Sequence, residues 1–127
     1  KLKVYQVYQV YQVMKITKFE DILSWQKAQK LSIFIYVLFK TNRDFSFKDQ
    51  IQRASVSVSN NIAEGFERKS NNELKYFLYI AKGSCGEVRS MAYTALELKY
   101  IQQQNFDEIS TSCLEIARLL SGLIRTL

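Results

Sequence analysis

The sequence predicts an all-α protein, an up-down-up-down antiparallel four-helix bundle. The chain has 127 residues, with no Pro and only four Gly. Because Pro and Gly are the residues that most often interrupt helices, their scarcity favours long helices. Four segments repeat apolar residues at steps of three and four, and short polar connections join them. Amphipathic helices of this kind bury one face each in a shared core, so we expect one bundle domain.

The first predicted helix runs from about residue 20 to residue 40. Its core face consists of residues at helical spacing, namely Trp25, Ala28, Leu31, Ser32, Ile35, Leu38 and Phe39. The polar stretch TNRDFS, 41–46, ends the pattern.

The second predicted helix contains the stretch SVSVSNNIAEGFERKS, 55–70, whose first residues alternate like a strand. The period of two soon fails, whereas helical spacing places one apolar face along the segment: Phe47, Ile51, Ala54, Ser55, Val58, Ile62, Gly65 and Phe66. Ser46 and Asp49 are the expected capping pair. Glu64 and Arg68 are four apart and are expected to pair. Gly65 is expected to admit a close neighbour or a left-handed turn.

The third and fourth predicted helices begin at capping-box patterns. Ser70-Asn71-Asn72-Glu73 starts the third, which is expected to reach about Gln102, and Asn105-Phe106-Asp107-Glu108 starts the fourth. Cys85 and Cys113 fall on the apolar faces of these two helices, where we expect them to be buried as small hydrophobic residues.

Residues 4–13 read VYQVYQVYQV, and this period of three matches neither a helix nor a strand. We interpret residues 1–13 as an appendage outside the fold and residues 14–127 as the bundle domain; a sticky strand is the alternative. The longest apolar run, IFIYVLF at 33–39, is far shorter than the ~20 residues that span a membrane. With no signal-peptide pattern, we expect a cytoplasmic protein without membrane contact.

A basic stripe on the third helix is the candidate nucleic-acid surface. The net charge is +6, and Lys75, Lys82 and Arg89 are seven residues apart, so they share one side of the helix. Cations beside aromatic rings provide phosphate neutralisation and base stacking. The candidate binding residues are Arg68, Lys69, Lys75, Lys82, Arg89 and Tyr93; Arg53, Arg118 and Arg125 are further basic positions. The alternative is an ordinary solvated face, because acids such as Glu87 alternate with these cations.

Apolar residues off the main stripes predict self-association. The candidate interface residues are Ile33, Phe34, Val37, Val56, Ala63, Tyr76, Tyr79 and Ile80. A monomer rarely leaves so much apolar surface in water, so we expect a homo-oligomer. A thick core that absorbs these side chains is the alternative, and the subunit number does not follow from the sequence.

An enzyme is the contrasting interpretation, and the sequence argues against it. The chain has no His, the usual general base. Asn60, Asn61, Glu64 and Arg68 are the only polar group that resembles a site, and they lack a nucleophile–base pair. We therefore expect no catalytic residue and no cofactor. We also expect no metal, because neither Cys belongs to a Cys-x-x-Cys pair.

Three segments resemble the four-helix bundle proteins of the 23S rRNA intervening-sequence family: WQKAQKL at 25–31, QIQRASVSVSNNIAEGFER at 50–68 and FLYIAKGSCGEV at 77–88. The resemblance runs from about Ile16 to the C-terminus, although Ser59 stands where the family usually has Pro. It extends to the accessory variability determinant proteins of diversity-generating retroelements. Those proteins are basic pentameric barrels that bind a reverse transcriptase and its RNA.

The resemblance therefore implies a bacterial homopentameric barrel and suggests a nucleic-acid role. Together with the basic stripe, it predicts a non-enzymatic bundle protein that binds RNA. The alternative is a protein-binding scaffold, such as an accessory subunit for a reverse transcriptase, with no direct nucleic-acid contact.

Overall fold

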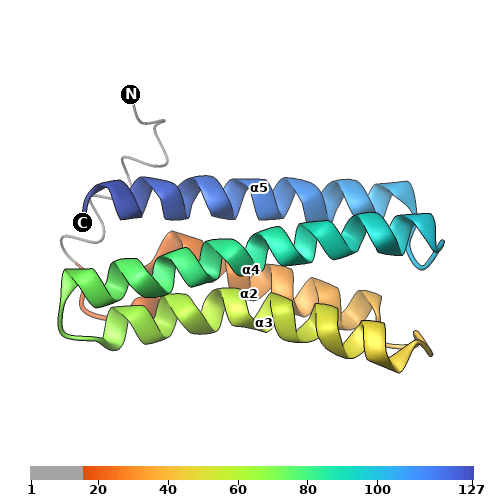
Figure 1. Cartoon of the computed structure of the whole chain (residues 1–127), viewed down its shortest axis with the longest axis horizontal. Coiled ribbons are helices and arrows are strands. Elements are labelled where there is room, and N and C mark those ends of the chain that lie inside the picture. Colours follow the sequence, from red (N-terminus) through yellow and green to blue (C-terminus); the bar gives the residue numbers. More distant parts are fainter. Residues whose placement is uncertain (1–15) are drawn as a thin grey trace.

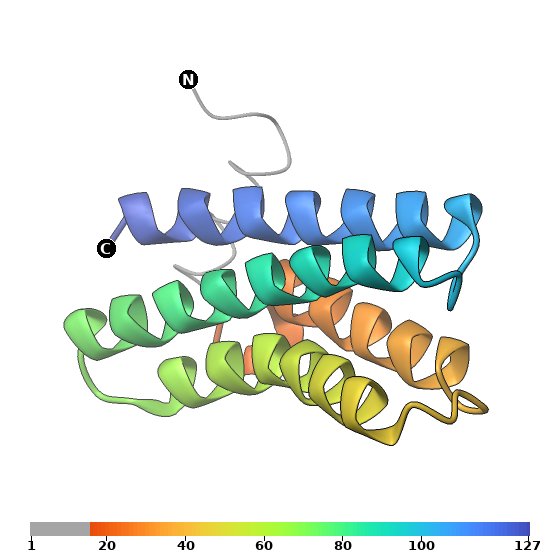
Figure 2. The same ribbon diagram turned by 45° about the vertical axis from the view of Figure 1, so that its right-hand side comes forward.

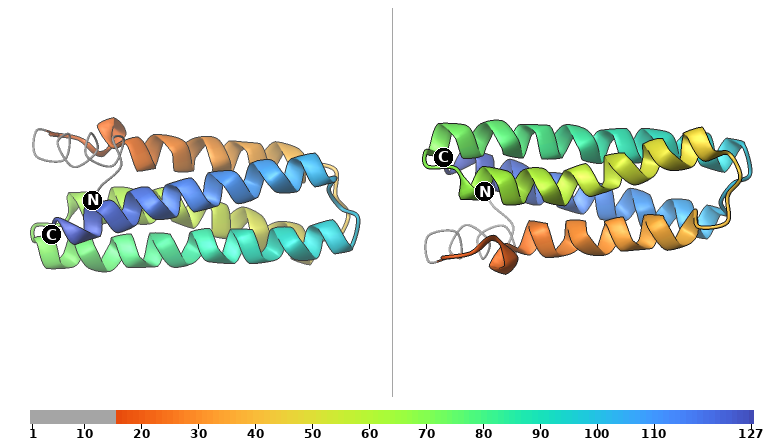
Figure 3. Two further views of the ribbon diagram at one scale, coloured as in Figure 1. Left: turned by 90° about the horizontal axis from the view of Figure 1, so that it is seen from above. Right: turned by 90° about the horizontal axis from the view of Figure 1, so that it is seen from below.

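In the computed structural model, which describes residues 16–127, four long helices form a bundle (Figure 1). A short 3-10 turn, η1 (Phe19–Asp21), precedes α2 (Leu23–Leu38), α3 (Phe45–Glu67), α4 (Asn71–Glu97) and α5 (Gln103–Arg125). Each helix packs on the next one, and α2 also packs on α5, so that α2 and α4 lie diagonally across the bundle (Figures 2 and 3). Residues 16–127 contain no strand, which confirms the all-α prediction. The predicted appendage, 1–13, lies outside the described residues.

The predicted apolar faces meet in the centre of the bundle. Every long helix contributes completely buried side chains, among them Ile35, Ile51, Val58, Ile62, Leu78, Val88, Ile109, Ile116 and Leu120. Each such side chain contributes about 1.5–3 kcal/mol by leaving water. Cys85 and Cys113 are each 1% exposed, as predicted. The Ser/Val alternation of 55–59 lies inside α3, so it forms no strand.

Two helix starts differ from the sequence prediction. Asp44 caps α3, because its Oδ1 accepts a hydrogen bond from the Phe47 N–H at 3.1 Å. The predicted capping pair of Ser46 and Asp49 is therefore wrong. Asn105 does not precede α5 but lies in its first turn, where its Oδ1 accepts from the Gln102 N–H at 3.0 Å. The predicted cap of α4 is confirmed, because Ser70 Oγ accepts a hydrogen bond from the N–H of Glu73, the third residue of the helix, at 3.2 Å.

The C-terminus of α4 also differs, because the helix ends at Glu97 rather than near Gln102. Lys99 adopts a left-handed conformation, with φ of 61°. The Lys99 N–H donates to the Leu96 carbonyl at 3.0 Å, and the Tyr100 N–H donates to the Ala95 carbonyl at 2.8 Å. These two bonds form a Schellman motif, which usually has Gly where this chain has Lys99.

The closest helix packing joins α3 and α4. A Cβ built on Gly65 would lie 2.8 Å from the Phe77 Cβ, so the absence of a side chain sets the separation of the two helices. None of the described glycines has positive φ, so Gly65 admits a close neighbour rather than a left-handed turn. Further along, Ser84 Oγ donates to Ser57 Oγ at 2.9 Å across the same interface.

A polar and aromatic cluster holds the opposite end of the bundle, where the α2–α3 and α4–α5 connections meet (Figure 1). The Tyr100 hydroxyl donates to Asp44 Oδ2 at 2.6 Å. The Tyr100 and Phe47 rings meet edge-to-face, with centroids 5.5 Å apart. The hydrogen bond from Tyr100, and then the one from the Phe47 N–H, lower the pKa of Asp44. The same hydrogen bond raises the pKa of Tyr100.

Replacing Gly65 by Ala is expected to destabilise the bundle. The new methyl group collides with the backbone-proximal Cβ of Phe77, which cannot move without shifting α4. Such overpacking lowers the free energy of unfolding by about 1–3 kcal/mol, measurable by urea denaturation. Asn60→Ala is the matched control, because that side chain is exposed on the same helix and lies outside the α3–α4 contact at Gly65. Equal stability of the two variants would contradict this account of the α3–α4 packing.

Replacing Asp44 by Asn is expected to remove a pH-dependent part of the stability. Because folding lowers the pKa of Asp44, its stabilisation is present above the unfolded-state pKa near 3.8 and is lost as pH falls through the lower folded-state value. Thermal unfolding should therefore separate the two proteins at pH 7 and bring them together near pH 2. A stability difference that is the same at both pH values would show that the carboxylate charge is irrelevant.

Candidate nucleic-acid interface

The predicted basic stripe lies on the side of α4 that faces α5. Lys75, Lys82 and Arg89 recur every seven residues, which is two helical turns and about 10 Å along the axis. Lys82 is exposed, whereas Lys75 and Arg89 are half-buried. Lys82 lines a groove between α4 and α5, which fixes the direction of the whole stripe because the other two share its face.

The groove between α4 and α5 contains more positive charge than the stripe alone. Its volume is about 240 Å³, and its lining residues are Lys82, Leu114, Ala117, Arg118, Ser121 and Arg125. Arg118 and Arg125 are exposed and are themselves seven residues apart on α5. None of these lining residues is acidic. We refer to this surface, with Lys75 and Arg89 added from the same side of α4, as the basic groove.

Arg89 lies close enough to Cys113 of α5 for its charge to affect the thiol. Burial raises the pKa of Cys113 to about 12, and the positive charge of Arg89 opposes part of that rise. Burial also raises the pKa of Cys85 above its usual range. Both thiols therefore stay protonated at neutral pH.

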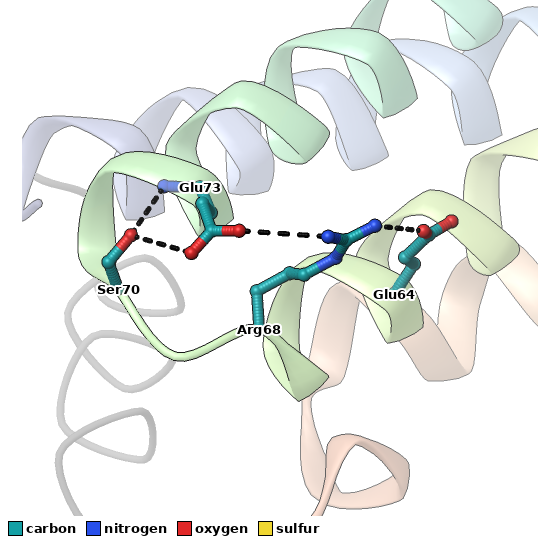
Figure 4. Close-up of polar contacts among 4 residues, drawn as sticks. All are labelled: Glu64, Arg68, Ser70 and Glu73. Carbon is teal, nitrogen blue, oxygen red and sulfur yellow. Dashed lines mark hydrogen bonds and ion pairs between the residues drawn. The ribbon is translucent and has the colours of Figure 1, made fainter.

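Arg68, another predicted binding residue, belongs to a different cluster at the α3–α4 turn (Figure 4). Its Nη2 donates to Glu64 Oε2 at 2.7 Å, and its Nη1 lies 3.7 Å from Glu73 Oε1. The bond with Glu64 raises the pKa of Arg68, and the guanidinium carbon lies 4.9 Å from the Phe77 ring centroid. The predicted Glu64–Arg68 pair is confirmed. Two carboxylates compensate this cation, and none of the residues that line the groove between α4 and α5 belongs to this cluster.

Lys69 and Tyr93, the remaining predicted binding residues, lie at opposite ends of α4. Lys69 is exposed in the connection before the helix. Tyr93 is 56% exposed, and its ring meets Phe106 of α5 edge-to-face with centroids 4.7 Å apart. Packing on Phe106 holds the Tyr93 ring in place between α4 and α5 while leaving most of it accessible. Tyr93 therefore accompanies the basic groove, whereas Lys69 precedes it.

The sequence identified Arg118 and Arg125 as further basic positions, but it did not predict that they lie next to the basic stripe of α4. Their spacing of seven residues was the available signal. Which side of α4 faces α5, and how far the two helices are shifted along each other, depends on packing that no local pattern encodes.

The candidate interface residues for self-association divide into exposed and half-buried groups. Exposed fractions are 56% for Ile33, 68% for Val37, 62% for Tyr76, 55% for Tyr79 and 36% for Ile80. Phe34 is half-buried against the core, and Val56 and Ala63 are half-buried on α3. The exposed members of the predicted interface thus lie on α2 and α4, the two diagonal helices.

Two exposed glycines lie on the outer face of α4. Cβ atoms built on Gly83 and Gly86 meet nothing within 4 Å, so packing inside this chain does not require either glycine. A Gly inside a helix is less favourable than Ala by about 0.5–1 kcal/mol. Their positions follow Tyr76, Tyr79 and Ile80 along the same side of the helix.

The polar group of α3 that resembles a site serves the fold in part. Asn61 Nδ2 donates to the Ser57 carbonyl at 2.8 Å and to Ser57 Oγ at 2.9 Å. Asn60, Asn61 and Glu64 line a shallow depression of about 380 Å³ on the surface of α3. Within residues 16–127, no group of three or more His, Cys, Asp or Glu side chains is arranged to hold a metal ion. In that same part of the chain, no helix has the length and apolarity needed to cross a membrane.

The fold and the sequence place the chain in a known class of helical-bundle proteins. The family model described as 23S rRNA-intervening sequence protein matches residues 20–122, so the chain belongs to this family. A crystal structure of a protein with unknown function from the S23 ribosomal protein family of Bacteroides thetaiotaomicron has the same fold, with a TM-score of 0.76 at 22% identity. The match covers 81% of this chain and 99% of that one. No curated protein sequence matches this chain significantly.

Proposed function

We propose that this chain is a non-enzymatic, cytoplasmic protein that assembles with copies of itself and binds RNA. The observation that supports RNA binding is the basic groove, which Lys82 of α4 lines together with Arg118 and Arg125 of α5. Lys75 and Arg89 lie on the same side of α4 as Lys82. Cations gathered on one surface without a carboxylate among the lining residues favour a polyanion. The absence of His from the sequence supports the non-enzymatic part of the proposal.

The proposed self-association uses the outer faces of α2 and α4. The face of α2 combines Ile33 and Val37 with Lys30 and contains no acid. The face of α4 combines Tyr76 and Ile80 with Glu87 and the two exposed glycines, Gly83 and Gly86. The α2 face of one copy thus suits the α4 face of another in both charge and apolar character.

Because α2 and α4 are diagonal helices, such a contact is head-to-tail and repeats from copy to copy. We propose that the repeated contacts close into a ring, which agrees with the pentameric barrel that the sequence resemblance implies. The exposed glycines provide room for a neighbouring helix to approach α4 closely.

Replacing Lys75 and Lys82 by Glu is expected to weaken RNA binding at least tenfold at about 0.1 M salt. The change removes two phosphate contacts, so the slope of log affinity against log salt should become shallower by about 1–2. The measurement is fluorescence anisotropy with a labelled structured RNA and the full chain, across a salt series.

Lys18→Glu/Arg43→Glu is the matched control for this charge change, since both residues are exposed and neither lines the groove between α4 and α5. Unchanged binding by the α4 variant would refute the groove as the RNA site. Failure of the unmodified chain to bind RNA even at low salt would instead favour the protein-binding scaffold, with a reverse transcriptase as one partner to test.

Replacing Gly83 and Gly86 by Leu is expected to break the assembly while leaving the fold of each copy intact. The larger side chains point into open space in the single chain but occupy the approach path of a neighbouring helix. Light scattering should give several times 14.9 kDa for the unmodified chain and a lower mass for the variant. Circular dichroism provides the control for folding. A mass of 14.9 kDa for the unmodified chain at micromolar concentration would contradict self-association.

A further inference from the structure

We infer that the basic groove binds a single-stranded segment of nucleic acid along the α4–α5 seam and discriminates against a duplex. This inference rests on the proposed RNA binding and names the form of RNA that the site takes. Three features carry it: the apolar side chains in the lining of the groove, the spacing of its cations, and the position of Tyr93.

The groove is a shallow hollow on the surface between two packed helices. Its lining includes the apolar side chains of Leu114 and Ala117 of α5 beside the cations of the two helices. One sugar–phosphate strand can lie along this surface and place ribose or base against these apolar groups.

The cations follow the seam in two rows. On α4, the first and last cations of the row, Lys75 and Arg89, are fourteen residues apart, which is about 21 Å along the helix. On α5, Arg118 and Arg125 line the opposite wall. Phosphates of one strand follow one another at about 3.4 Å along a stacked helix. The row of α4 therefore matches about six nucleotides, which is within the size range of sites for single strands.

Tyr93 adds a stacking surface at the end of the seam beyond Arg89. Its ring is 56% exposed, and edge contact with Phe106 fixes it at a centroid distance of 4.7 Å. An unpaired base can stack on such a ring, whereas a base inside a duplex is already stacked on its neighbours. The combination of a cation row and a fixed aromatic ring thus favours unpaired nucleotides.

The test compares labelled mixed-sequence RNA strands of 4, 6, 8 and 12 nucleotides with a 12-base-pair RNA duplex, using the full chain and fluorescence anisotropy. We expect affinity to rise with length up to about 6–8 nucleotides and then to level off. The duplex is expected to bind at least tenfold more weakly than the 12-nucleotide strand. With five phosphates neutralised, the log–log salt slope for the strand should approach about −3.5.

Two variants separate the contributions to single-strand binding. Arg118→Gln/Arg125→Gln should weaken binding of the strand at least fivefold and make the salt slope shallower by about 1.4. Lys18→Gln/Arg43→Gln is the charge-matched control and should change neither value. Tyr93→Leu keeps an apolar contact with Phe106, so it should weaken single-strand binding severalfold and leave the salt slope unchanged.

The outcomes distinguish this inference from the proposed function. Equal binding of strand and duplex, or a Tyr93→Leu variant that binds as well as the unmodified chain, would overturn the single-strand inference while RNA binding stands. Loss of affinity in the Lys18→Gln/Arg43→Gln control equal to that of the α5 variant would overturn the groove as the site. No binding to any of these RNAs at low salt would refute the proposed function itself.

Discussion

The close approach of α3 and α4 at Gly65 is the constraint on which the rest of the bundle depends. A side chain there would meet the Cβ of Phe77 at 2.8 Å, so the separation of the two helices is set where the chain turns back. Small residues continue this packing, and Ser84 Oγ donates to Ser57 Oγ between the helices. Once α3 and α4 are fixed in this way, the side of α4 that faces α5 is also fixed, because the remaining core positions must point inward.

The same turn determines which cations remain available to a partner. Arg68 is held by Glu64 and by Glu73, and it also lies over the Phe77 ring. These exposed ion pairs add little stability individually, but together they orient the chain between α3 and α4. Positive charge also gathers along the α4–α5 seam, where Lys82, Arg118 and Arg125 line one groove. The candidate nucleic-acid interface therefore lies along the long side of the bundle, at the α4–α5 seam, rather than at the N-terminus of α4.

The sequence predicted what depends on local periodicity and missed what depends on competition between neighbouring groups. The core faces, the Ser70 cap and the Glu64–Arg68 pair follow from spacing along one helix, and the structure contains all of them. Asp44 replaces Ser46 as a cap because its carboxylate also accepts from Tyr100, a residue distant in the sequence. Lys99 ends α4 in a conformation usually reserved for Gly. The basic groove could not be predicted from the sequence, because it depends on how α4 and α5 are aligned along each other. Only packing determines that alignment.

The exposed glycines and the basic groove lie on adjoining sides of α4. Gly86 follows Lys82 by four residues, about one helical turn, so the two are neighbours on the helix surface, whereas Gly83 lies further toward the outer face. A neighbouring copy on the outer face would therefore border the α4–α5 seam, and the proposed self-association and the proposed nucleic-acid binding are expected to influence each other. Repetition around a ring would present one seam for each copy. If the chain binds RNA as proposed, several weak single-strand contacts would then act together on one RNA, and their avidity would exceed the affinity of a single basic groove.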